Sequence, residues 1–539
     1  MSEMITSYLN SMSAGYFVCQ TATVFMLFLF GCLIVFSLNG GSMSVFEYLL
    51  SFPVGISAYS LSVFVILILN IPVGRMSVTV MPAAIAIICL IFIYKKSMAG
   101  KTDKRIMVFC IITALCIAVI STSGLLAVSI SNDSLYYYSM YPSAIVHFGE
   151  LRKQFNVFLT DVGQTSATLN TLPFLYGFNE AFGIQWFLNI NTLLIIMYAL
   201  WEKAAEGTDN RSGDKKDIKA ADKTKVKITA AVLITAGVLV SSMPYVIMSR
   251  WAMSNTYFMC FIFICAYTAR RYSGAIGYVC ASCMTDETGD TRKDNQPVSL
   301  GGRPVIQGIL FAMMAFLRME GCIAALILLL CFSTLKGFSN RQLFVNFLLP
   351  VLTLSLLYDI KIFHFMKIDA PYTFLTRGKA LIQLAALAAA GVYVLFIRGK
   401  VSMIEKDVKL LIPTGLILIN AALFVYDRAL YIENTKAFIA NISNQSGWGM
   451  FPMLIIGVYV MCLVVSRKDK WAFGYEDLCF AAYFLTALAV SFARGDALRE
   501  NIGDSGNRVM LQGILLAFYA AAVHVIGLLN TENSENGNF

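Results

Sequence analysis

The chain has 539 residues, of which 58% are hydrophobic and 14% are charged, and its mean hydropathy is +0.70. Soluble domains carry about 25% charged residues, so this composition excludes a soluble enzyme. It predicts an all-α polytopic membrane protein. The net charge of +9 does not indicate a nucleic-acid partner, because the basic residues cluster in short loops between apolar runs, a pattern that membrane topology explains.

The 13 cysteines mostly stand singly within apolar runs, where cysteine behaves as a small buried hydrophobic residue. Cys280 and Cys283 form a close pair, but they have no second pair or nearby histidine and indicate a metal or redox site only weakly. The sequence therefore predicts no disulfide framework, no metal and no other cofactor.

The first segment, 1–105, contains apolar runs near 16–38, 54–73 and 78–94, each of which predicts a transmembrane helix. The next run, 106–130, carries no charge and also predicts a helix. Further helices are predicted near 182–201, 228–248, 254–269, 342–358, 381–397, 410–427, 449–466, 472–493 and 508–530. The total is about 13–15 transmembrane helices.

Two shorter apolar pieces, 305–317 and 321–334, flank Arg318 and Glu320. Each is shorter than the roughly 20 residues of an upright span, so the pair predicts a kinked hairpin or a re-entrant pair. Ionisable residues at such depth usually face a cavity or each other.

The distribution of lysine and arginine predicts the orientation of the chain. One set of loops carries 27 basic residues and is predicted to be cytoplasmic: 95–105, 202–227, 270–304, 335–341, 398–409 and 467–470. The opposite set carries 12 and is predicted to face the periplasm or the exterior: 131–181, 249–253, 359–380, 428–448 and 494–508.

Three of these outer loops, 131–181, 359–380 and 494–508, are rich in polar residues. In the first, apolar residues recur at helical spacing from Ile145 to Phe155, which predicts an amphipathic helix in the membrane interface. The other two bring together many cations: Lys361, Lys367, Arg377, Lys379, Arg494, Arg499 and Arg508. These cations could bind a lipid-linked phosphate, pair with neighbouring carboxylates, or contact lipid headgroups.

Three further titratable residues have simpler interpretations. Glu476 and Asp477, near the start of a predicted helix, are expected at the membrane interface. His524 is expected to be a hydrogen-bonded core histidine. No nucleotide-binding or hydrolase motif occurs, so the sequence does not support cytoplasmic nucleotide chemistry.

Four motifs, in order and all predicted on one face, resemble the GT-C superfamily of integral-membrane glycosyltransferases. An acidic-then-aromatic motif, 132–137, opens the first outer loop. An Arg-x-Glu-Gly break lies at 318–321, a Pro-x-Thr-Phe sequence at 371–374, and an Arg-led entry to the last helix at 507–511. The resemblance covers roughly 106–530. It implies a GT-C-like seven-helix module with large outer loops in 106–380, followed by C-terminal transmembrane helices in 381–539.

The resemblance implies transfer of a hexose or pentose from a polyprenyl-phosphate carrier to an extracytoplasmic glycan, lipid or protein. The general base would be Asp133, which must reach the acceptor hydroxyl. The polyprenyl phosphate is a stable leaving group, so the reaction does not obviously require a metal. The other candidate residues would bind the substrates: Tyr136, Tyr137, Glu150, Arg318, Lys367, Arg377, Lys379 and Arg508.

Two other functions remain open at this point. A lipid-linked glycan flippase would also have many helices and internal cations, but its charges should line a path on both sides of the membrane midplane. A polysaccharide polymerase or ligase would share the phosphate-binding cations and the large loops, without needing an acid placed like Asp133. Each function would place the protein in the cell membrane, and the active site of a glycosyltransferase would face the periplasm or the exterior.

Overall fold

The computed structural model is almost entirely helical, and its described residues contain no β-strand. They are 14–39, 43–97, 136–177, 183–209, 254–282, 302–368, 375–400, 402–443, 455, 457–461, 474–493 and 505–535. The helices predicted at 106–130 and 228–248 lie outside the described residues. Cys283 of the Cys280–Cys283 pair also lies outside them.

The chain divides into two compact units, one formed by Met1–Leu188 with Trp251–Leu410 and one by Asn189–Arg250 with Leu411–Phe539. The predicted segments 1–105, 106–380 and 381–539 divide the chain by sequence motifs rather than by contacts, and they stay a prediction. Two helices contain a boundary between the units, α11 (Gly183–Asp209) and α20 (Ser402–Tyr426).

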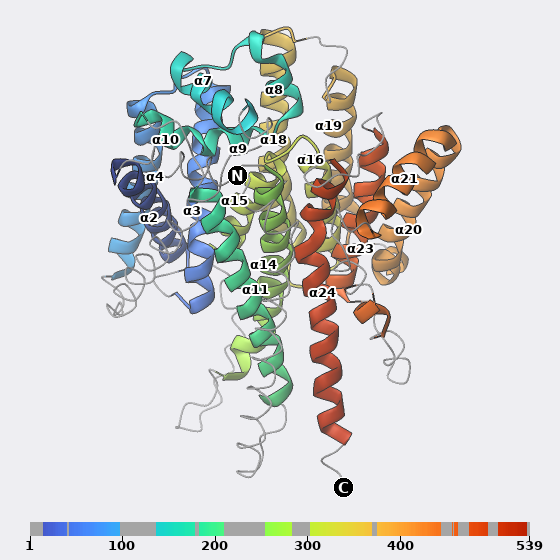
Figure 1. Ribbon diagram of the computed structural model, residues 1–539. Helices are drawn as coiled ribbons and strands as arrows, with labels where there is room; N and C mark the ends of the chain where they lie inside the picture. The colour runs from blue at the N-terminus through green and yellow to red at the C-terminus, as the bar shows by residue number, and fades with distance from the viewer. Residues whose placement is uncertain are drawn as a thin grey trace. The chain divides into compact units, whose positions relative to one another are not determined.

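The first unit holds most of the described helices (Figure 1). Its α-helices are α2 (Ala14–Leu38), α3 (Val45–Ile68), α4 (Arg75–Ser97), α7 (Tyr141–Phe148), α8 (Asn156–Asp161), α9 (Gln164–Leu169), α10 (Thr171–Leu175), α14 (Ser254–Ser282), α15 (Arg303–Ala315), α16 (Gly321–Ser333), α17 (Asn340–Gln342), α18 (Leu349–Asp359) and α19 (Arg377–Val392). Short 3₁₀ or π segments are η2 (Tyr136–Met140), η3 (Lys153–Phe155), η5 (Leu343–Leu348), η6 (Ile360–Phe365) and η7 (Tyr393–Ile397).

Helices α2 and α3 pack backbone to backbone through two glycines. A Cβ atom at Gly31 would overlap the backbone of Ser51, and one at Gly55 would overlap the backbone of Leu27. Small residues at such positions are what allow close packing of membrane helices. This contact places α2 against the largely buried α3.

Helix α3 begins at Val45, well before the predicted start near 54. The backbone N–H of Ser44 donates to the Glu47 carboxylate, 2.8 Å away, so this acidic residue caps the start of the helix. Pro53 lies inside the helix.

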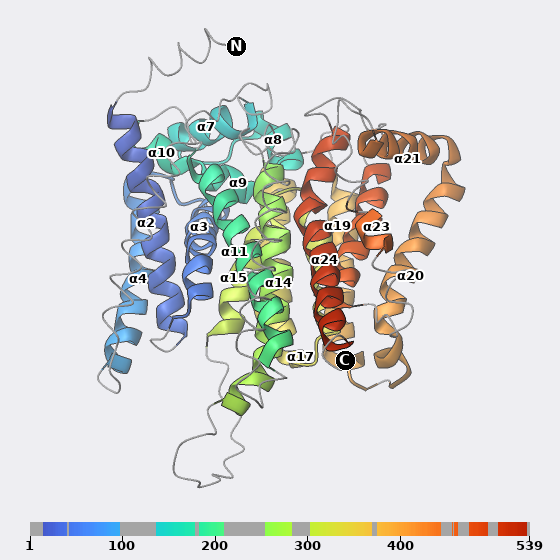
Figure 2. The ribbon, with the colours of Figure 1, turned by 60° about the horizontal axis from the view of Figure 1, so that its bottom comes forward.

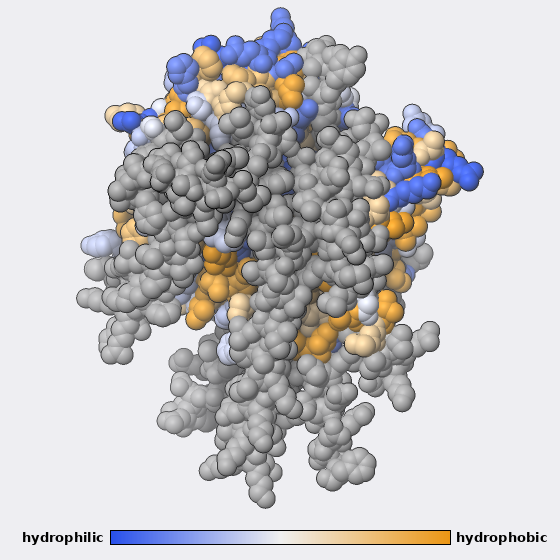
Figure 3. All heavy atoms as spheres, viewed as in Figure 1, coloured by the Kyte–Doolittle hydropathy of each residue, from blue (hydrophilic) through white to orange (hydrophobic). Residues whose placement is uncertain are grey.

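A layer of four short helices, α7 to α10, lies across one end of the first unit (Figures 1 and 2). The predicted single amphipathic helix is wrong, because α7 ends at Phe148 and Gly149 adopts a left-handed φ of 72°. The apolar side chains nevertheless meet, since the rings of Phe148 and Phe155 lie 6.2 Å apart. Hydrophilic residues gather over α7 and α8 (Figure 3).

Helices α15 and α16 confirm the prediction of two short helices interrupted at Arg318 and Glu320. Two predicted boundaries nearby are wrong. The helix that starts at Asn340 continues through two π segments to Phe365, so 359 does not begin a loop. Helix α14 runs on to Ser282, beyond its predicted end at 269.

The second unit contains α21 (Arg428–Ser443), α23 (Tyr475–Ala493) and α24 (Ser505–Glu535). The predicted loop 428–448 therefore holds a helix. Ala437 and Phe438 of α21 are buried and pack against Phe484 and Leu488 of α23 and Val509 of α24. This contact explains why a polar segment becomes an ordered helix.

Eight helices of the described chain are long and apolar enough to cross a membrane, and three shorter apolar helices accompany them. Few residues of helix α4 are buried, and it exposes side chains such as Ile87, Ile88 and Phe92. Large apolar surfaces of this kind suit contact with lipid. The protein is thus an all-α polytopic membrane protein, while the total of about 13–15 spans stays a prediction.

Candidate functional site

The predicted base, Asp133, lies outside the described residues. Tyr136 and Arg508 fall within described helices, but their side chains lie outside the description. Tyr137 packs edge-on against Phe158, with ring centroids 5.2 Å apart. Tyr137 therefore belongs to the aromatic packing of the α7–α10 layer.

Glu150 forms an exposed ion pair with Arg152, at 3.1 Å between the Arg152 Nε and the carboxylate. The guanidinium of Arg152 also lies 4.0 Å from the centre of the Phe148 ring. Exposed pairs of this kind contribute little stability, and these contacts place Glu150 on the surface of the layer.

Arg318 lies in the turn between α15 and α16, where its Nε pairs with the Glu320 carboxylate. Its Nη1 donates to the hydroxyl of Ser254 at the start of α14, at 3.0 Å. Both charged side chains are mostly buried. The break is thus held by a polar network, as expected for ionisable residues at membrane depth.

Helix α9 docks directly onto this break. The backbone N–H of Thr165 donates to the Phe316 carbonyl, and its hydroxyl donates to the Met313 carbonyl, both at 3.0 Å. The chain enters α9 through Gly163, where a Cβ atom would overlap the backbone of Leu317. The α7–α10 layer is therefore fixed to the turn that carries Arg318.

Gln164, the first residue of α9, is fully engaged by the layer itself. Its amide nitrogen donates to the carbonyls of Phe158 and Val162, both at 2.9 Å, and its amide oxygen accepts from the Tyr141 hydroxyl at 3.0 Å. Burial raises the pKa of the Tyr141 phenol above its ordinary value, which keeps that hydroxyl a neutral donor.

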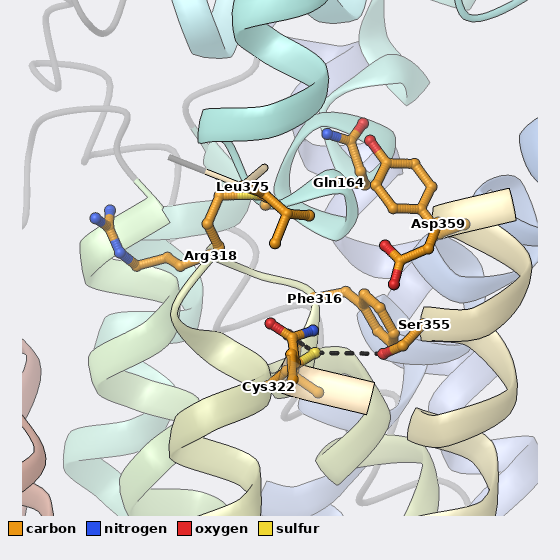
Figure 4. A pocket seen from close by; sticks show the side chains of 12 residues that line it. Gln164, Phe316, Arg318, Cys322, Ser355, Asp359 and Leu375 are labelled. Atoms are coloured by element: carbon orange, nitrogen blue, oxygen red, sulfur yellow. Dashed lines mark hydrogen bonds between the residues drawn. The ribbon is translucent and has the colours of Figure 1, made fainter. Parts of the chain in front are cut away.

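A small pocket of about 30 Å³ lies where the break, α9, α18 and the start of α19 meet (Figure 4). Its lining includes Gln164, Arg318, Cys322, Ser355 and Asp359. The Asp359 carboxylate points into the pocket, whereas the Arg318 guanidinium points away from it (Figure 4). The volume suits about two water molecules or one small polar group.

The Oδ2 atom of Asp359 is buried and has no hydrogen-bond partner within the described part of the chain. The neighbouring polar groups are otherwise occupied, since the Cys322 thiol and the Ser355 hydroxyl lie 3.5 Å apart and interact with each other. A buried carboxylate without a partner is costly, so its retention calls for an explanation.

Sequence reasoning placed Asp359 at the start of a loop and missed its burial. The helix instead continues past it, and Ser355 and Asp359, four residues apart, share one helix face. Tyr358 anchors this turn by donating from its hydroxyl to the Leu159 carbonyl in α8, at 2.8 Å. The four-residue spacing of Ser355 and Asp359 could have predicted a shared helix face, but it could not predict the pocket.

The predicted phosphate-binding cations lie beside the same pocket. Arg377 and Lys379 are exposed in the first turn of α19, which the hydroxyl of Thr376 caps by accepting from the Lys379 backbone N–H at 3.3 Å. Residues on either side of this turn, Leu375 and Gln383, line the pocket. Helix α19 thus begins at 377 rather than near 381, and it brings two cations and a helix N-terminus to the pocket rim.

The remaining candidate from this segment, Lys367, is exposed and has a left-handed φ of 53°. Arg377 reaches back to the segment before it, donating from Nη2 to the Phe363 carbonyl at 3.4 Å. Residues 369–374, which contain the Pro-x-Thr-Phe sequence, lie outside the described residues.

No protein-family model, curated protein or solved structure matches this chain. Membership of the GT-C superfamily therefore rests on the sequence motifs alone and stays a prediction. Among the described residues, no group of three or more His, Cys, Asp or Glu side chains could hold a metal ion.

The second unit contains a separate polar cluster around Asp477. The side chain of Asp477 is 1% exposed and therefore buried within the protein, while its place at the membrane interface stays a prediction. It accepts hydrogen bonds from the Tyr459 hydroxyl at 2.9 Å and the Gly474 backbone N–H at 2.8 Å, and it lies 2.7 Å from His524 Nε2. His524 is thus a hydrogen-bonded core histidine, as predicted.

Proposed function

We propose that this chain is an integral-membrane glycosyltransferase of GT-C type, which transfers a sugar from a polyprenyl-phosphate carrier to an extracytoplasmic glycan, lipid or protein. The observation that carries the proposal is the polar pocket at the interrupted helix pair. It combines a buried carboxylate, whose Oδ2 atom has no hydrogen-bond partner among the described residues, with a cation-bearing helix N-terminus at its rim. A lipid-linked sugar needs both, because its hydroxyls seek acceptors and its phosphate seeks cations.

The phosphate is assigned to the first turn of α19. Arg377 and Lys379 supply positive charge there, and the N-terminus of a helix favours anions through its free N–H groups. As the bond between the sugar and the phosphate breaks, negative charge develops on the phosphate. Cations already in place stabilise that charge without reorganisation.

Arg318 is assigned a positioning role. Its guanidinium pairs with Glu320 and Ser254 and points away from the pocket. It holds the turn onto which α9 docks, and α9 in turn supplies one wall of the pocket. The proposal thus gives Arg318 a positioning role in place of the substrate binding expected from the sequence.

Asp359 is assigned to a substrate hydroxyl. Its free acceptor atom and the size of the pocket suit one hydroxyl group of the sugar or the acceptor. The proton transfer stays with Asp133. The acceptor oxygen attacks the anomeric carbon, the bond to the phosphate oxygen breaks, polyprenyl phosphate leaves, and the hydroxyl proton passes to the Asp133 carboxylate.

The test is turnover of a labelled polyprenyl-phosphate sugar in membranes that contain the wild type or the Asp133→Asn variant. The variant keeps the size of the side chain but cannot take the proton, so transfer should fall by roughly a hundred- to ten-thousandfold. Donor binding should persist, because a carboxylate repels the phosphate.

The matched control is Asp407→Asn, which removes an exposed carboxylate at the start of α20 and should leave turnover unchanged. A flippase would move the labelled lipid across the membrane with its sugar still attached. Movement without release of polyprenyl phosphate would therefore replace the proposed function, and full turnover by Asp133→Asn would remove Asp133 from the mechanism.

A further inference from the structure

A large cavity lies among the three N-terminal helices and shares no lining residue with the polar pocket. Its volume is about 490 Å³, and its walls come from α2, α3, α4 and α10. This size falls in the range of roughly 300–1,000 Å³ that is typical of small-molecule sites. Helices α2, α3 and α4 precede the segment that resembles GT-C enzymes, and the proposed function gives them no role.

The cavity exists because short side chains line the face of α4 that looks toward α2. Thr79, Ala83 and Ala86 recur at helical spacing along this face and do not reach across the gap. The opposite wall is largely apolar, with Met26 and Phe30 of α2 among its residues. A largely apolar space of about 490 Å³ suits part of a hydrocarbon chain.

One border of the cavity is cationic. Arg75 begins α4, and its Nε donates to the Leu175 carbonyl at the end of α10, at 2.6 Å. The guanidinium carbon lies 5.9 Å from the centre of the Tyr176 ring. Within the part of the chain that the structure describes, its two terminal nitrogens have no hydrogen-bond partner.

The position of Arg75 is fixed by the turn that precedes it. The backbone N–H of Val73 donates to the Gly149 carbonyl at 2.7 Å, which ties the turn to the α7–α10 layer. The hydroxyl of Ser77 donates to the Pro72 carbonyl at 2.6 Å and accepts from the Gly74 N–H at 2.9 Å. The guanidinium is therefore presented from a rigid helix start, beside the hydrophilic layer.

We propose that this cavity binds a lipid, with one hydrocarbon chain between α2 and α4 and the lipid phosphate on Arg75. A guanidinium with free N–H groups forms strong, charge-assisted hydrogen bonds to phosphate oxygens. The outer face of α4 is apolar and exposed, so a lipid can enter from the bilayer. Membrane glycerophospholipids and polyprenyl phosphates share this chemistry, and the site does not depend on glycosyl transfer.

The experiment titrates the full-length protein in detergent with phosphatidylglycerol, phosphatidylcholine and a polyprenyl phosphate, and measures lipid binding by native mass spectrometry. At least one of the two anionic lipids should bind more tightly than phosphatidylcholine. Arg75→Gln should weaken that binding roughly ten- to a hundredfold, the usual effect of losing one charge-assisted contact. Lys153→Gln removes an exposed cation of the layer that does not line the cavity, and should change nothing.

A second pair of variants tests the cavity itself. Ala86→Phe fills the space and should lower binding of every lipid, while Ala84→Phe, on α4 but outside the cavity lining, should not. If Arg75→Gln fails to fold, Arg75→Lys keeps the charge and should retain the preference for the anionic lipid.

The same titrations distinguish a membrane phospholipid from a polyprenyl phosphate as the bound lipid. Tighter binding of phosphatidylglycerol than of the polyprenyl phosphate identifies a membrane lipid, and the reverse identifies the carrier lipid. Either result supports the site. Unchanged binding of the anionic lipids by Arg75→Gln, or of every lipid by Ala86→Phe, would overturn it.

Discussion

Replacing Asp359 with asparagine distinguishes a functional carboxylate from a structural one, because the two roles predict opposite changes in stability. Its Oδ2 atom is buried and makes no hydrogen bond among the described residues. A buried polar group without a partner costs about 1–3 kcal/mol, and more when it is charged. Asp359→Asn keeps the shape of the side chain and removes the charge, so the free energy of unfolding should stay the same or rise by about that amount.

Activity should change in the other direction. If Asp359 accepts a hydrogen bond from a substrate hydroxyl, its loss removes a bond to a charged group, worth about 1.5–3 kcal/mol. Transfer should then fall by roughly ten- to a hundredfold. A protein that becomes more stable as it loses activity shows the trade-off expected of a functional site.

The assay pairs thermal unfolding of the purified protein in detergent with turnover of the labelled polyprenyl-phosphate sugar in membranes. Asp407→Asn serves as the control, since that carboxylate is exposed and should affect neither measurement. A variant that unfolds at lower temperature while turning over at the normal rate would show that Asp359 is structural, and the assignment to a substrate hydroxyl would be withdrawn.

Two further predictions concern the layer and the orientation. Gly163→Ala should lower the free energy of unfolding by about 1–3 kcal/mol, because its Cβ would overlap the Leu317 backbone. The control Gly415→Ala has open space around it and should not lower this free energy. If both variants unfolded at the same temperature, α9 would not be held at the break. In a cysteine-free background, Lys153→Cys should react with an impermeant thiol reagent from outside, and Lys215→Cys only after permeabilisation. Labelling of position 215 alone in intact cells would reverse the predicted orientation.

The sequence predicted the elements whose signal is local. Arg318 and Glu320 interrupt an apolar stretch, and the cost of charges in a hydrophobic helix was enough to predict the break that separates α15 from α16. The long apolar runs that form α2, α4 and α23 were predicted for the same reason, since about 20 apolar residues suffice to cross a bilayer.

The sequence could not predict features that depend on distant contacts. An aspartate at the end of an apolar run indicates the exit from a membrane helix, yet the helix continues beyond Asp359, and the pocket that it enters is completed by Gln164 and Leu375. Gly163 and Leu317 are far apart in the chain, so their close approach left no local pattern. Helix α21 is polar enough to resemble a loop, and it is ordered around Phe438, which packs on two other helices.

The arrangement of charges at the pocket also constrains how a lipid-linked sugar would bind under the proposed function. Arg377 and Lys379 are exposed at the rim, while the carboxylate of Asp359 is buried inside. A phosphate placed in the pocket would be buried beside the Asp359 carboxylate, with the Arg318 guanidinium pointing away, and a buried charge without a cation is costly. At the rim the same phosphate meets two cations and a helix N-terminus. The carrier phosphate would therefore stay at the start of α19, and only an uncharged hydroxyl would enter the pocket, which makes Asp359 a determinant of the sugar or the acceptor rather than of the lipid carrier.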